Sequence, residues 1–216
     1  TEEGDANRLQ LALVLSNLSG LLSKEDPQRA VQYAVEALAN QTEALENDRN
    51  NAKLATKVVV TLNTLGSAQS QNSQNDAAIN TFCRAIEISD QLLDRWPQQP
   101  TYQRDLVISL NHLGLALSRS GDLQEAGKAF ERALQNQRQL VNQYGSDAET
   151  HSMLGGVLNN IGFLHKQLGD GNAAAVAYDE AVQQQSIAAE IAPEVDRYRD
   201  YLRKHEYNLA ELEESS

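Results

Sequence analysis

Residues 110–114 read Leu-Asn-His-Leu-Gly, and residues 126–133 read Ala-Gly-Lys-Ala-Phe-Glu-Arg-Ala. The same pattern recurs 48 positions earlier and 48 positions later, with no gap between the copies. A fixed period of this kind is the signature of a repeat architecture, in which copies of one supersecondary unit stack on one another. The aligned columns are a glycine column (Gly66, Gly114, Gly162), an alanine column (Ala78, Ala126, Ala174) and an aromatic column (Phe82, Phe130, Tyr178).

Each unit is predicted to form two helices. In the stretch 104–120, leucines recur at steps of three and four, which is the spacing of one helical face. Gly121 ends this stretch, and Asp122 with Glu125 three residues later is a capping-box-like start for a second helix. We therefore expect an all-α protein of about nine helices. The first helices are expected at 5–23, 51–71, 99–120 and 147–168, their partners at 26–49, 74–96, 122–144 and 171–192, and the ninth at 194–213.

The glycine column needs a packing reason, because glycine in a helix interior costs about 1 kcal/mol relative to alanine. We expect these glycines to let the second helix of the unit approach closely, with the alanine column on the other side of the contact. The aromatic column is expected to fill the space toward the next unit. All three columns are thus predicted to be structural.

The order aliphatic-x-x-aliphatic-Gly, then Ala-x-x-x-aromatic-x-x-Ala, resembles the tetratricopeptide repeat. The usual unit has 34 residues, and the extra length here corresponds to about four helical turns, which keeps the apolar faces in phase. Units with Leu-Asn-Asn-Ile-Gly, as at 158–162, look like the extended repeats of kinesin light chains. The start Tyr-Gln-Arg-Asp-Leu at 102–106 is similar to repeat regions attached to bacterial serine/threonine kinases.

The resemblance implies a right-handed α-solenoid of stacked antiparallel helix pairs, whose first helices line a concave face. Such a face holds extended peptides or partner helices. The chain is therefore predicted to be a non-catalytic scaffold for protein–protein interaction. The alternative is a regulatory or localising region of a larger enzyme, with a serine/threonine protein kinase as the leading case. We expect one solenoid domain over 1–216, with repeats at 1–50, 51–98, 99–146 and 147–193 and a capping helix at 194–216.

Asparagines in the first helices are the leading candidates for a peptide-binding site. An asparagine side chain donates and accepts hydrogen bonds, so a row of them could hold a peptide backbone without reading its side chains. The alternative is that they bond neighbouring helices to one another. Asparagine is a poor helix former, so its recurrence needs one of these causes. The candidates, called here the asparagine ladder, are Asn17, Asn63, Asn111, Asn159 and Asn160, together with His112.

Composition disfavours other classes of function. The chain has 18 Lys and Arg against 30 Asp and Glu, and a nucleic-acid partner is not expected because phosphate binding needs a basic face. It has no apolar run of about 18 residues that could span a membrane. Its histidines and single cysteine show no metal-ligand spacing, and no nucleophile with a base is legible, so we expect no metal, cofactor or catalytic residue.

The expected partner is a protein or peptide, and the oligomeric state is left open. We expect a cytoplasmic location. Because the sequence begins at Thr1 rather than at methionine, it is interpreted as a piece of a longer chain.

Overall fold

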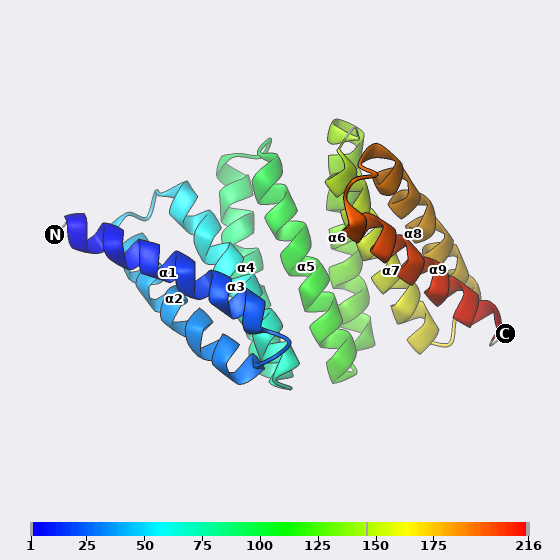
Figure 1. Ribbon diagram of the computed structural model, residues 1–216, viewed down its shortest axis with the longest axis horizontal. Helices are drawn as coiled ribbons and strands as arrows, with labels where there is room; N and C mark the ends of the chain where they lie inside the picture. The colour runs from blue at the N-terminus through cyan, green and yellow to red at the C-terminus, as the bar shows by residue number, and fades with distance from the viewer. Residues whose placement is uncertain (1, 146, 215–216) are drawn as a thin grey trace. The chain divides into compact units, whose positions relative to one another are not determined.

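The protein, seen in a computed structural model that describes residues 2–145 and 147–214, consists of helices joined by short turns (Figure 1). The described residues hold no strand, and the predicted all-α class is confirmed. Every predicted helix boundary lies within three residues of the observed one. The helices are α1 (Glu2–Leu22), α2 (Pro27–Asn47), α3 (Ala52–Gln71), α4 (Asn75–Arg95), α5 (Pro100–Ser120), α6 (Leu123–Tyr144), α7 (Ala148–Gln167), α8 (Gly171–Ile191) and α9 (Asp196–Glu214).

A side-chain cap marks the start of α6. Oδ1 of Asp122 accepts a hydrogen bond from the backbone N–H of Glu125 at 3.3 Å, as the capping pattern predicts. The Glu125 carboxylate itself is bonded to Nζ of Lys128 at 2.5 Å. In the turn before Asp122, Gly121 has a φ of +86°, a conformation that glycine adopts without strain. Local signals therefore explain the break between α5 and α6.

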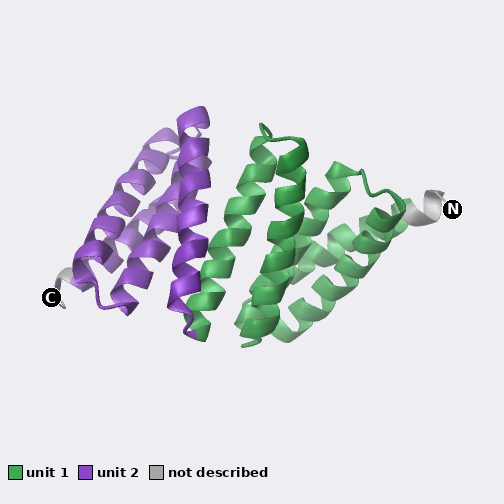
Figure 2. Ribbon diagram, turned by 180° about the vertical axis from the view of Figure 1, so that it is seen from behind, with its two compact units in different colours: residues 1–120 green, residues 121–216 purple. Residues whose placement is uncertain are grey.

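The chain forms two compact units, residues 1–120 and residues 121–216 (Figure 2). In the first unit, α1 packs against α2 and α3, and α3 packs against α2, α4 and α5. In the second unit, α7 packs between α6 and α8, and α9 lies against α8 with a smaller contact to α7. The boundary between the units falls within the predicted repeat 99–146, after its first helix.

In each of the two compact units, a glycine of the glycine column leaves room for an aromatic ring. A Cβ atom added to Gly66 would lie 2.5 Å from Cε1 of Phe82, and one added to Gly162 would lie 2.6 Å from Cδ1 of Tyr178. The predicted close approach is present. The aromatic ring that fills the space comes from the second helix of the same pair, whereas the sequence predicts that the aromatic column fills the space toward the next repeat. The third copy is divided by the unit boundary, and its members, all buried, are Gly114, Ala126 and Phe130.

The alanine column packs toward the helix that follows. Ala78 forms an apolar cluster with Phe82 and with Ala116 of α5. Ala174 forms the corresponding cluster with Leu212 of α9 and with its own aromatic neighbour. A small side chain at this position therefore lets the next helix approach.

Two buried glutamines form a further structural column, which the sequence pattern alone does not reveal. Nε2 of Gln137 donates to the backbone carbonyl of Thr150 at 2.7 Å, and Nε2 of Gln185 donates to that of Tyr198 at 3.0 Å. Both glutamines are fully buried and stand 48 positions apart. Each bond ties a second helix to the start of the following first helix.

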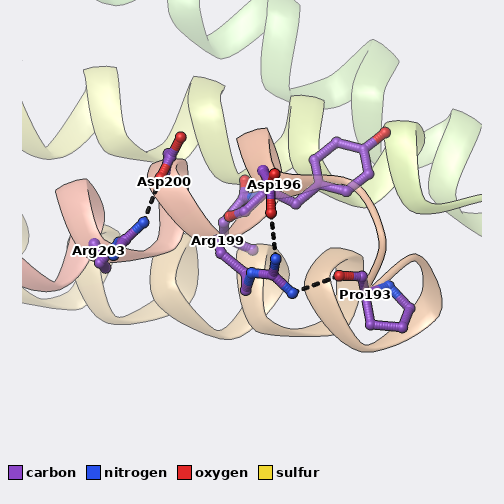
Figure 3. A network of polar contacts seen from close by, with 7 residues as sticks. Pro193, Asp196, Arg199, Asp200 and Arg203 are labelled. Atoms are coloured by element: carbon purple, nitrogen blue, oxygen red, sulfur yellow. Dashed lines mark hydrogen bonds and ion pairs between the residues drawn. The ribbon is translucent and has the colours of Figure 1, made fainter.

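Helix α9 covers the second unit with an apolar face and turns a charged face outward. Tyr198 and Leu212 are buried, whereas Arg199 bonds to Asp196, and an Arg203–Asp200 pair follows one turn later (Figure 3). Exposed pairs of this kind contribute about 0–1 kcal/mol, so the apolar face holds the helix. Within residues 2–145 and 147–214, every helix is too short or too polar to span a bilayer.

Candidate peptide-binding groove

A cavity of about 290 Å³ opens among the first helices of the first unit. Helix α3 contributes Val60 and Asn63 to its lining, and α5 contributes Asp105, Ile108 and His112. Positions three, four and seven apart lie on one face of a helix, so each helix presents a single stripe to the cavity. Gly20, near the end of α1, completes this side of the lining.

Three polar atoms at the groove have no hydrogen-bond partner among the residues that the structure describes. They are Oδ1 of Asn63, Oδ2 of Asp105 and Nδ1 of His112. Asn63 is only 7% exposed and Asp105 only 8%. Most buried polar groups in proteins are hydrogen-bonded, and a cluster of exceptions needs an explanation. Each of these atoms is itself almost fully covered, so a ligand reaches it only when the side chain turns toward the cavity.

Burial also changes the charge states of two of these groups. Burial raises the pKa of the Asp105 carboxyl from 3.8 to about 6. Burial, together with the positive charge of Arg119, lowers the pKa of His112 from 6.5 to about 4. The imidazole packs against the Phe82 ring, with 5.3 Å between centroids. At pH 7 the groove therefore contains an ionised carboxylate beside a neutral imidazole.

The asparagine ladder divides between different environments. Asn63 lies in the groove, whereas Oδ1 of Asn159 accepts a bond from Nδ2 of Asn208 at 2.7 Å and so joins α7 to α9. Asn111 and Asn160 are half-buried, and Asn17 is exposed. Of the predicted site residues, Asn63 and His112 are therefore the ones that line this groove.

Asp105 is a groove residue that the repeat pattern of the sequence does not reveal. Its column holds Lys57, Asp105 and Met153, so the repeat period carries no signal for it. The available signal is its spacing to Ile108 and His112, which places the three side chains on one face of α5. A charged residue on such a face is a candidate once that face is known to line a groove.

A second hollow, of about 440 Å³, lies between α6 and α7 in the second unit. Half of its lining residues are aliphatic, with Leu134, Leu164 and Leu168 among them, and Glu131 and His165 are polar members. No group of three His, Cys, Asp or Glu side chains in the described part of the chain lies close enough together to hold a metal ion. Buried polar atoms without a described partner also occur in the second unit, on Gln137 and His205, but neither residue lines this hollow.

Asn159→Ala is expected to lower the free energy of unfolding by about 1 kcal/mol, because Asn208 loses its bond across the helix pair. Asn63→Ala removes a buried oxygen that has no partner among the described residues, and is expected to leave stability unchanged or raise it by a few tenths of a kcal/mol. Urea unfolding of the two variants, followed by circular dichroism, measures both changes. Equal losses would show that Asn63 is also bonded within the fold.

The antiparallel helix pairs and the groove between first helices define a helical-repeat scaffold protein. The family model described as Tetratricopeptide repeat matches residues 60–92 and 108–140. Each matched segment begins within a first helix and runs through most of the second. The predicted family resemblance is confirmed. In this chain the repeats recur at the longer period of 48 residues.

A solved structure shares this fold. BtubC (BKLC) from P. vanneervenii matches with a TM-score of 0.52 and 14% identity, over 97% of this chain and 90% of that one. TTC0263, a thermophilic TPR protein in Thermus thermophilus, matches with a TM-score of 0.45 and 17% identity, over 96% of this chain and 91% of that one. At 14% identity the likeness to BtubC concerns the fold alone. No curated protein matches the sequence.

Proposed function

We propose that this chain is a non-catalytic scaffold that binds an extended peptide segment of a partner protein in the groove between α1, α3 and α5. Tetratricopeptide repeats are protein-interaction modules, and their first helices line the binding face. The observation that carries the proposal is the set of unpartnered atoms on Asn63, Asp105 and His112 around one cavity. Peptide groups both donate and accept hydrogen bonds, so a bound segment would satisfy them.

The walls of the groove support a peptide rather than a polar small molecule. Val60 and Ile108 line the same groove as the polar atoms, and Val60 is 48% exposed. Binding sites typically combine apolar walls with a few placed polar groups, which fix the orientation of the ligand. A peptide offers both an apolar side chain for the walls and a backbone for the polar atoms.

Blocking the groove tests this proposal. Peptides are selected from a displayed random library on the wild-type protein, and their affinities are measured on Gly20→Leu. An added Cβ at Gly20 would meet only Cγ2 of Thr64, at 4.0 Å, so a larger side chain fits the helix and extends beside the groove. Ala39→Leu, at an exposed position of α2, is the matched control.

We expect the selected peptides to bind Gly20→Leu about tenfold more weakly or worse, and to bind Ala39→Leu as they bind the wild type. Equal binding to both variants would place the peptide site elsewhere. Failure to select any peptide would count against peptide binding as the function.

A further inference from the structure

We propose that the groove recognises one lysine or arginine side chain of the bound peptide, whose cationic nitrogen pairs with the carboxylate of Asp105. This inference rests on the proposed function, because it names the side chain that the groove selects in the peptide. It assigns Asp105 as a specificity-determining residue. The basic residue is supplied by the partner protein.

The carboxylate of Asp105 has no counter-charge among the described residues. Asp105 is 8% exposed, and no described residue bonds to its Oδ2. Buried carboxylates in proteins are as a rule paired with a cation, because an isolated buried charge is costly. The described ion pairs of this chain, such as Arg8–Glu43, lie on exposed side chains instead. A cation from outside the chain would complete the pair that the fold leaves open.

The volume of the cavity limits which groups can enter it. A volume of about 290 Å³ is at the lower limit of sites for small molecules, which are about 300–1,000 Å³. It is suited to one long side chain. Lysine and arginine bury their methylene stems along apolar surface while the charged end reaches a polar group. Val60 and Ile108 provide that surface beside Asp105.

The polarity of the neighbouring atoms also decides which charge the groove accepts. Oδ1 of Asn63 is a second unpartnered acceptor at the groove. An ammonium group has three donors and a guanidinium group has five, so one cation has enough donors for more than one acceptor of the groove. His112 is neutral at pH 7 because burial lowers its pKa to about 4, and it adds no positive charge. The cluster therefore favours a cationic donor over an anion.

The test compares selections on three proteins. The displayed random peptide library is selected on the wild type, on Asp105→Asn and on Asp94→Asn. Asparagine keeps the shape of aspartate and removes its charge. Asp94 is an exposed residue of α4, so its replacement makes the same change in net charge outside the groove. Circular dichroism melts establish that each variant is folded.

We expect peptides from the wild type and from Asp94→Asn to share a lysine or arginine at one position. Those peptides should bind Asp105→Asn about thirtyfold more weakly or worse, as for removal of one partner of a buried charge pair. Replacing the shared basic residue of the peptide by methionine should weaken binding to the wild type by a similar factor. The same replacement in the peptide should change binding to Asp105→Asn only slightly.

The other outcomes separate this inference from the proposed function. Selected peptides without a shared basic residue, or equal binding to Asp105→Asn, overturn the inference. The proposed function then still stands if Gly20→Leu weakens binding. Failure to select any peptide on the wild type overturns both.

Discussion

Gly162→Leu is expected to lower the free energy of unfolding of the second unit by about 3 kcal/mol. The first added carbon would lie 2.6 Å from the ring of Tyr178, and that residue is 1% exposed. Because the buried ring has no solvent-filled space to enter, either helix α8 must shift or the ring must leave its packing. Urea unfolding followed by circular dichroism gives the change in stability.

The same helix provides a matched control. A Cβ added to Gly156 meets no atom within 4 Å, so Gly156→Ala is expected to stabilise the unit by about 0.5–1 kcal/mol through helix propensity. A loss of stability in Gly162→Leu together with a gain in Gly156→Ala would establish that Gly162 leaves space for the Tyr178 ring. It would exclude helix flexibility as the reason for a glycine there. An unchanged stability in Gly162→Leu would contradict the packing of Tyr178 against this position.

Asp105→Asn is expected to raise the free energy of unfolding at pH 7 by about 2–3 kcal/mol. The pKa of Asp105 is about 6 in the folded protein against 3.8 for an ordinary aspartate, and each unit of such a difference corresponds to about 1.4 kcal/mol. The wild type must bury an unpaired charge at pH 7, whereas asparagine is neutral. A gain in stability with a loss of peptide binding is the expected combination for a residue kept for recognition.

The pH dependence of the free energy of unfolding tests whether Asp105 destabilises the fold at pH 7. Between pH 3.8 and about 6 the folded state holds the Asp105 proton more tightly than the unfolded chain, so this group makes stability fall as the pH rises. His112 acts in the opposite direction, because its folded pKa of about 4 lies below 6.5 and the unfolded chain binds the proton more tightly. The two contributions oppose each other in the wild type.

In Asp105→Asn the contribution of His112 to the pH dependence of stability remains, and the opposing contribution of Asp105 is absent. Urea unfolding midpoints measured from about pH 4 to 7 should therefore rise more steeply with pH in this variant than in the wild type. His205, whose pKa burial also lowers to about 4, contributes equally to both proteins and cancels in the comparison. Parallel pH profiles would show that Asp105 is paired in solution.

The helical class, the period and the helix boundaries could all be predicted from the sequence. They follow from local physics, because the spacing of apolar residues, the caps and the glycine or proline breaks all act within a few residues of the chain. Helix α5, predicted at 99–120 and observed at Pro100–Ser120, is an example. The close approach at Gly66 could also be predicted, because a glycine that recurs within a helix needs a packing cause.

Which side chain fills that space depends on tertiary packing. Phe82 rather than Ala78 lies against Gly66, since the outcome depends on the rotation and height of one helix relative to the other. Tertiary packing also separates two members of one sequence column. Asn159 finds Asn208 on the neighbouring helix, while the residue at the same offset from Asn63 is His112, and Asn63 keeps an unpartnered oxygen among the described residues.

Asp105 is the clearest case of a property that arises only when the helices pack together. In the sequence it is one acidic residue among 30 Asp and Glu, in a column that does not repeat. Packing of α1, α3 and α5 removes water from its carboxyl, and this desolvation raises its pKa, while its Oδ2 finds no partner among the described residues. Desolvation depends on residues brought together from distant parts of the chain, so no local pattern could have predicted it.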